Sequence, residues 1–393
     1  MQTDMTVGKP MKMLLNFTIP VFLGNVFQQL YSMADAVIVG KFVGTKGLAA
    51  VGATGTITFL IIGFLMGVTT GVTVLTSQKF GAGRMDEMRK TVGNAAILSA
   101  VIAVVMTAVS MLGMHRLLVF MHTPEDIFDG AYGYIMIICA GIFTQVLYNL
   151  VSSILRALGN SKTPLYFLIL AAGLNIVLDL VFIIFFHWGA PGAAWATVIS
   201  QGVSGVLCLI YMWKAVPELK MKKEDWYFNR DIAVKQISVG IPMGLQYSIT
   251  AIGSVIIQAA VNSLGSVAVA SVAAAVKINM FLCCPYDAMG STMATYAGQN
   301  VGAGKFDRLK QGEKSCTLLG LVYGIAAFIF ILLFGKYLAL LFVDASEEVI
   351  INQAHLFLMC NSAFYFPLAL VNIFRFTIQG MGFSRLAILA GVC

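Results

Sequence analysis

The sequence predicts an all-α polytopic membrane protein built from two six-helix lobes, the second of them incomplete. Three observations lead to this fold class. Hydrophobic residues make up 59% of the 393-residue chain and charged residues only 11%, whereas a soluble domain carries about 25% charged residues. Apolar runs long enough to cross a bilayer recur along the chain. Finally, segments about 222 residues apart resemble each other, which is typical of a duplicated unit.

Ten predicted spans account for most of the chain. They cover residues 13–40, 48–77, 92–114, 131–155, 164–187, 191–213, 232–262, 266–297, 315–335 and 351–375. Residues 387–390 have the composition expected at the start of an eleventh span. Prolines such as Pro20, Pro242 and Pro285 interrupt several spans. Membrane helices tolerate such breaks where neighbouring helices or a cavity satisfy the freed backbone groups.

The lysines and arginines are distributed unevenly between the loops. If the N-terminus is cytoplasmic, twenty of the 25 basic residues fall in cytoplasmic segments and four in outer segments, while Lys277 lies inside a span. Positive residues concentrate on the cytoplasmic side of membrane proteins. The sequence therefore predicts a multi-pass protein of the plasma membrane with a cytoplasmic N-terminus. The net charge of +7 then reflects topology, and we expect no nucleic-acid partner.

Short motifs recur at a nearly constant offset. Residues 78–86 read QKFGAGRMD, and residues 299–307 read QNVGAGKFD. Ile19-Pro20 recurs as Ile241-Pro242. Because the repeated unit holds six spans, an even number, both copies enter the membrane in the same sense. The two lobes should therefore be related by a pseudo-two-fold axis along the membrane normal.

This repeat defines the predicted domain organisation. We expect an N-terminal lobe over residues 1–213, a cytoplasmic loop over 214–231, and a C-terminal lobe over 232–393. Rocking of two such lobes provides alternating access. Adding the repeat length to the end of the first copy places the end of the second near residue 435. We therefore expect about 40 residues, or two helices, to be missing from the second lobe.

The chain resembles the multidrug and toxic compound extrusion (MATE) family. The resemblance rests on the doubled QxxGAG motif, on DAVIVG at residues 35–40 and on RALGNSKTP at residues 156–164. It implies twelve helices in two six-helix lobes. It further implies a transporter, not an enzyme, that exports cationic or amphipathic drugs in exchange for H⁺ or Na⁺, with no cofactor other than this coupling ion. We expect the protein to act as a monomer.

Three carboxylates lie inside predicted spans, where a charge is costly and usually functional. They are Asp35, Asp179 and Asp287. Asn175 precedes Asp179 by one helical turn and therefore shares its face, and Thr197 lies in the middle of span six. Together with Asp35, these residues match the polar network of the N-terminal lobe in prokaryotic MATE proteins. The resemblance implies that the network binds the coupling cation.

A buried carboxylate pair suits this role physically. Desolvation disfavours the charged form of a carboxyl group, and a second carboxylate nearby disfavours it further, so the two groups titrate as a unit. Such a pair either accepts a proton or holds Na⁺, with the Asn175 and Thr197 oxygens as additional ligands. The sequence does not choose between H⁺ and Na⁺ as the coupling ion. The alternative is a structural polar cluster that only holds the helices together. Beyond Na⁺ we expect no metal site, because the four histidines are scattered.

Further polar residues are candidates for the substrate cavity. In the first lobe they are Gln28, Tyr31, Tyr134 and Asn149; in the second they are Lys277 and Asp287. The resemblance implies cavity-facing positions for the first set, but ordinary interhelical hydrogen bonding would explain them equally well. Lys277 repels cations, offers a counterion to anionic substrates, or reaches toward the membrane surface. Asp287 is a candidate for a second cation site.

A flippase is the alternative to drug antiport. Lipid-linked oligosaccharide flippases of the same superfamily often line their cavity with several basic residues, whereas Lys277 is the only basic residue that the sequence places in mid-span. We therefore keep the flippase as the second hypothesis. Some MATE proteins carry a carboxylate in span ten, where this chain has Leu368. The two GAG motifs lack the GK[ST] sequence of a phosphate-binding loop and predict tight turns that redirect the chain.

Overall fold

The computed structural model describes residues 3–384 and residue 387, which form helices without any strand in these ranges. The first bundle contains α1 (Pro10–Phe42), α2 (Thr45–Val72), α3 (Val74–Gly81), α4 (Met85–Phe120), α5 (Glu125–Ala140), α6 (Ile142–Ala157), α7 (Lys162–Leu180), the π-helical turn η1 (Val181–Phe185) and α8 (Gly189–Ala215). The connection holds η2 (Pro217–Leu219) and η3 (Lys223–Trp226). The second bundle contains α9 (Arg230–Asn262), α10 (Ser266–Gly302), α11 (Phe306–Ala339), α12 (Glu348–Ala363) and α13 (Tyr365–Gly380).

The helices confirm the predicted fold class and the ten spans. Eight helices are long and apolar enough to cross a membrane, and two bent pairs bring the number to ten. These pairs are α5 with α6, bent by 46°, and α12 with α13, bent by 47°. At the first bend, the lack of a side chain on Gly141 leaves room for Val198 of α8, whose methyl group would lie 2.2 Å from an added Cβ. The eleventh span predicted over 387–390 lies, except for residue 387, outside the described residues.

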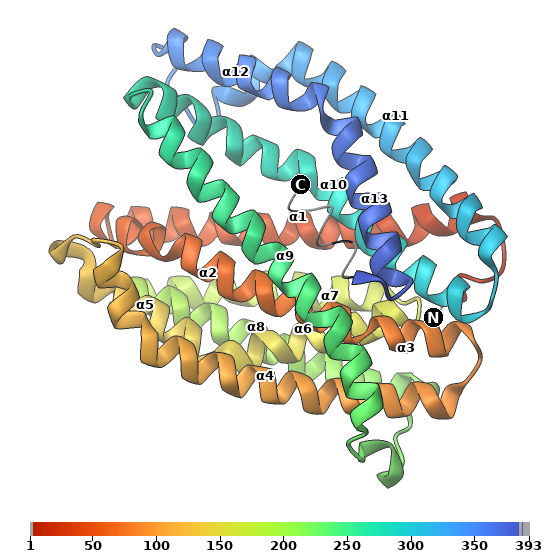
Figure 1. Ribbon diagram of the computed structural model, residues 1–393. Helices are drawn as coiled ribbons and strands as arrows, with labels where there is room; N and C mark the ends of the chain where they lie inside the picture. Colours follow the sequence, from red (N-terminus) through yellow and green to blue (C-terminus); the bar gives the residue numbers. More distant parts are fainter. Residues whose placement is uncertain (1–2, 385–386, 388–393) are drawn as a thin grey trace.

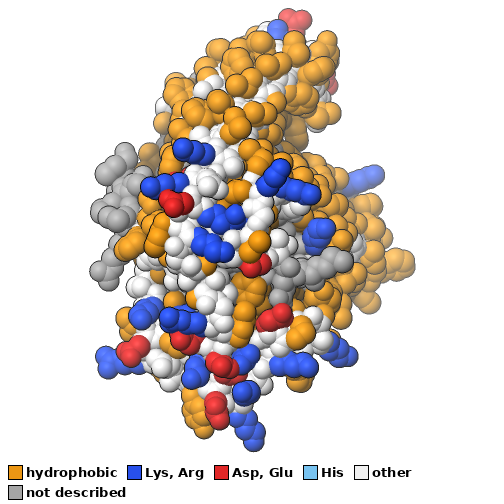
Figure 2. Space-filling model, turned by 90° about the vertical axis from the view of Figure 1, so that its right-hand side faces the viewer, with side chains coloured by type: hydrophobic (Ala, Val, Ile, Leu, Met, Phe, Trp, Pro, Cys, Tyr) orange, Lys and Arg blue, Asp and Glu red, His pale blue; other side chains and the backbone are white. Residues whose placement is uncertain are grey.

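The two bundles meet at one end of the molecule and diverge toward the other (Figure 1). The N-terminal segment and the turns after α3 and α10 lie at the end where they meet (Figure 1). Lysine and arginine side chains gather on this face (Figure 2). We call it the basic end. The main contacts between the bundles pair α2 with α9 and place α3 and α1 against α10.

The two GAG motifs pack against each other at the basic end. A Cβ added at Gly81 would lie 2.0 Å from the backbone oxygen of Gln299, and one added at Gly302 would lie 1.9 Å from that of Gln78. Each motif thus places its first glycine on the glutamine of the other. Gly83 and Gly304 have φ angles of +70°, which confirms the predicted turns. The glycines therefore allow the backbones of the two motifs to touch, and they also allow the chain to turn at each motif.

The N-terminal segment inserts between the bundles at the same end. The Met5 amide donates to Oε1 of Gln299 at 2.9 Å, and the Thr3 amide donates to the Gly159 oxygen at 3.3 Å. Gln299 in turn donates through Nε2 to the Ala157 oxygen at 2.9 Å. Met5 is fully buried. Because these bonds join α10 to the end of α6 through residues 3–5, the segment ties the two bundles together.

Gly302→Ala should open the basic end. The added methyl group meets backbone rather than a flexible side chain, so the bundles must separate, at a cost of about 1–3 kcal/mol by analogy with overpacked cores. We expect longer distances between spin labels at the exposed positions 90 on α4 and 310 on α11, measured by double electron–electron resonance. Gly113→Ala is the matched control, because an added Cβ there meets nothing within 4 Å. An unchanged distance distribution in Gly302→Ala would contradict the contact.

Candidate cation site

The four residues predicted to bind the coupling cation lie together, although α1, α7 and α8 supply them from distant parts of the sequence. Asn175 donates through Nδ2 to Oγ1 of Thr197 at 3.5 Å. Thr197 donates through Oγ1 to Oδ2 of Asp35 at 3.4 Å. Asp179 is fully buried, and its carboxyl group lies within interaction distance of that of Asp35. The predicted residues therefore form one cluster.

The local structure of α7 explains how this cluster is held. Asn175 and Asp179 are one turn apart and both buried, because this face of α7 packs between α1 and α8. Two residues after Asp179, the helix widens into the π-helical turn η1. Such turns occur often at functional sites. The widened turn follows the carboxylate with only Leu180 between them.

Several oxygens of the cluster have no donor. Oδ1 of Asp35, Oδ1 of Asn175 and both carboxyl oxygens of Asp179 are buried without a hydrogen-bond partner among the described residues. Buried acceptors of this kind are costly unless something satisfies them. A proton shared by the two carboxyl groups would do so, and so would Na⁺, a hard cation that prefers oxygen ligands. The residues present therefore fit either coupling ion.

Aromatic and amide side chains surround the carboxylates. Tyr31 lies beside Asp35 and interacts with Gln28, and Tyr134 lies within electrostatic range of both carboxyl groups. The Tyr31 hydroxyl accepts from Nε2 of Gln201 at 3.5 Å. Gln201, which sequence reasoning missed, follows Thr197 by one turn of α8, and this spacing is the signal that could have found it.

The remaining predicted cavity residues lie apart from this cluster. Asn149 is buried on α6, and no hydrogen bond joins it to the cluster in the described structure. Asp287 is accessible on α10 and lies near Tyr247 and Arg375. Lys277 is exposed, and its ammonium group lies 5.6 Å from the ring centre of Phe342. These placements leave the roles of all three residues as predictions.

The position of Lys277 as the only basic residue in mid-span stays a prediction. The predicted span 351–375 has Arg375 as its last residue, whereas α13 continues to Gly380. Arg375 donates through Nη2 to Oδ1 of Asn372 at 2.7 Å. With its amide turned so that its oxygen faces Arg375, Gln246 accepts from the same guanidinium at 2.9 Å. Arg156 likewise lies inside α6. Both arginines belong to the twenty basic residues counted above in cytoplasmic segments.

A known family model matches most of this chain. The MatE family model matches residues 20–181 and 242–393, two segments whose starting points differ by about one repeat length. The chain belongs to the MATE family. It is therefore a multi-pass membrane protein of a transporter family.

Individual relatives agree with this assignment. The probable multidrug resistance protein YpnP of Bacillus subtilis is 30% identical over 94% of this chain and 82% of its own length. YoeA of the same organism, also named a probable multidrug resistance protein, is 27% identical over 93% and 80%. A solved outward-facing multidrug resistance MATE transporter superposes with a TM-score of 0.92 at 25% identity, covering 99% of this MATE chain and 86% of that one.

Asp179→Asn should alter how stability depends on pH. As pH rises and the wild-type pair loses its shared proton, two neighbouring buried charges repel each other, so the melting temperature should fall. The variant keeps one carboxyl group and should lose less stability over the same rise in pH. Thermal unfolding in Na⁺-free nanodiscs measures this, with the exposed Asp129→Asn as control. Parallel curves for wild type and Asp179→Asn would exclude the interaction.

Proposed function

We propose that this MATE protein exports cationic or amphipathic drugs across the plasma membrane by antiport against H⁺ or Na⁺. The cluster of Asp35, Asn175, Asp179 and Thr197 is the proposed coupling site. The observation that carries the proposal is the buried carboxylate pair, whose oxygens lack partners among the described residues. A cation satisfies them, and its release leaves two like charges together. Cation binding and release therefore change the local free energy enough to drive a conformational step.

The basic end is the proposed cytoplasmic end. Its lysines and arginines follow the distribution expected of cytoplasmic segments, and the bundles meet there (Figures 1 and 2). In this orientation the structure is closed toward the cytoplasm and corresponds to an outward-facing state. In alternating access, the opposite state separates the bundles at the basic end and brings the outer halves together.

Helix α1 is the proposed link between the coupling site and the bundle interface. It carries Asp35, and about five turns earlier its Thr18 donates through Oγ1 to Oγ1 of Thr292 on α10 at 2.9 Å. Pro20 lies inside α1 just after Thr18, where it removes a backbone hydrogen bond and weakens the helix locally. A rearrangement around Asp35 would therefore act on a helix that also contacts the second bundle.

The flippase alternative gains no support from the comparisons. The relatives described above carry multidrug resistance names. Lys277 is the one basic residue that the sequence places in mid-span, and this prediction still favours drug export over a flippase. Drug export is therefore preferred on the relatives, with substrates of the cationic or amphipathic class.

Asp35→Asn and Asp179→Asn should each reduce export at least about 100-fold, the size of effect expected when an essential proton or cation ligand is lost. Ethidium uptake into inverted proteoliposomes, with a pH gradient or a Na⁺ gradient imposed separately, measures this. The gradient that drives wild-type transport identifies the coupling ion. Asp126→Asn is the control, because Asp126 is exposed and lies 3.9 Å from Lys46 in a surface pair. Wild-type transport by both variants would refute the proposed coupling site.

A further inference from the structure

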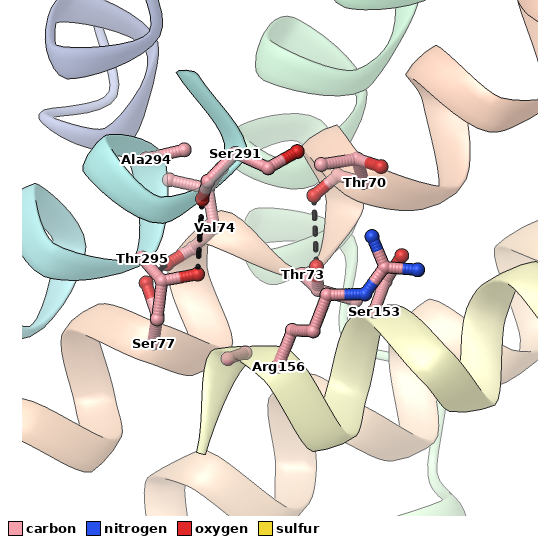
Figure 3. Close-up of a pocket in the computed structure, with 10 residues that line it drawn as sticks. Thr70, Thr73, Val74, Ser77, Ser153, Arg156, Ser291, Ala294 and Thr295 are labelled. Atoms are coloured by element: carbon pink, nitrogen blue, oxygen red, sulfur yellow. Dashed lines mark hydrogen bonds between the residues drawn. The ribbon is translucent and has the colours of Figure 1, made fainter. Parts of the chain in front are cut away.

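A small cavity lies between the two bundles and does not belong to the cation site. Helices α2, α3 and α6 supply one side of it and α10 supplies the other (Figure 3). Its volume is about 20 Å³, which is room for about one body the size of a water molecule. Its wall carries one charged side chain, that of Arg156, and six side chains with hydroxyl groups.

Arg156 presents an unneutralised positive charge to this cavity (Figure 3). Its guanidinium group makes no ion pair or hydrogen bond with any residue from 3 to 384. The ionisable side chains within electrostatic range of it are Tyr148, Tyr247 and Cys208, and none of these is a carboxylate. A guanidinium does not lose its proton in proteins. A half-buried charge between membrane helices therefore calls for a compensating anion.

The hydroxyl groups of the cavity wall fall into two classes. Thr73, Ser77 and Thr295 donate to backbone oxygens of their own helices, so their protons are occupied. Thr70, Ser153 and Ser291 make no hydrogen bond through their hydroxyl groups with the described residues, so these protons are available to a ligand. Ser153 lies one turn before Arg156 on α6, on the same face, whereas Ser291 belongs to α10 of the other bundle.

We propose that this cavity binds a monovalent anion of the size of chloride, held by the Arg156 guanidinium and the hydroxyls of Ser153 and Ser291. The charge of the site is positive and the free hydroxyls can donate, which favours an anion over a cation. The volume leaves room for one monatomic ion. Because its ligands come from both bundles, the bound ion stabilises their contact at the basic end. This inference does not depend on the proposed drug export.

Anion-dependent stability tests the proposal on the full chain in nanodiscs. We expect the melting temperature to rise when chloride replaces gluconate at constant ionic strength and pH, and to saturate with chloride concentration. Arg156→Gln should raise the half-saturating concentration about tenfold or more, the loss expected for a charge-assisted hydrogen bond. Ser291→Ala, a milder change on the other bundle, should raise it less. Arg116→Gln, which removes an exposed charge of α4, should leave the chloride response unchanged.

Bromide locates the ion directly. Crystals grown in bromide should show an anomalous peak between Arg156, Ser153 and Ser291, and the peak should be absent from Arg156→Gln crystals. If Arg156→Gln does not fold, Ser291→Ala supplies the comparison in both experiments. A melting temperature insensitive to chloride, or a bromide peak elsewhere with none in this cavity, would overturn the proposal. An equal chloride response in Arg116→Gln and Arg156→Gln would also overturn it.

Discussion

Close contact between glycine backbones at the basic end is the constraint on which the rest of the structure depends. Lipid is as apolar as the helix surfaces, so membrane helices associate through packing and hydrogen bonds instead of through a hydrophobic driving force. Here α2 and α9 approach so closely that a Cβ at Gly67 would lie 2.4 Å from the Met243 oxygen, and one at Gly71 would lie 2.5 Å from Cα of Gly240. The GAG motifs extend this contact beyond the ends of α3 and α10. Packing energy is therefore concentrated where the bundles meet, which lets them diverge elsewhere.

Polar groups complete this interface instead of weakening it. Gln236 on α9 donates through Nε2 to the Val72 oxygen at 3.0 Å and to the Thr91 oxygen at 2.8 Å. Gln78 of the first motif donates to the Gly380 oxygen at 3.0 Å. The Val72 and Gly380 oxygens lie at the C-terminal ends of α2 and α13, where the helix itself offers no partner. A conformational change that separates the bundles must break these bonds together, so the closed arrangement behaves as one state.

Hydropathy and the internal repeat predicted the spans because both can be read along the sequence, without knowing how the helices pack. The helices run beyond the predicted edges, as α10 does to Gly302, since a helix continues after its residues cease to be apolar. The same continuation places Arg156 and Arg375, which the sequence puts at the edges of spans, within α6 and α13. Asp35 and Asp179 stood out because intramembrane carboxylates are rare, whereas a single glutamine such as Gln201 in an apolar span gives no such signal.

Contacts between the two copies of the repeat were beyond the reach of sequence reasoning. The GAG motifs predicted turns, and Gly83 and Gly304 form them. That Gly81 and Gly302 touch the partner motif follows only from how the bundles are placed. The same holds for the segment around Met5, whose partner Gln299 is 294 residues away. Nothing in an N-terminal segment indicates that it will be buried between two bundles.

In the proposed mechanism, cation binding at Asp35 and Asp179 controls the contact at the basic end. Distance distributions across that end, measured by double electron–electron resonance in nanodiscs at low and high pH, with and without Na⁺, test this coupling. We expect the coupling ion to shift the populations of short and long distances in the wild type. The double variant Asp35→Asn/Asp179→Asn should give one distribution under all conditions. A wild-type distribution that ignores both ions, or a double variant that still responds, would contradict it.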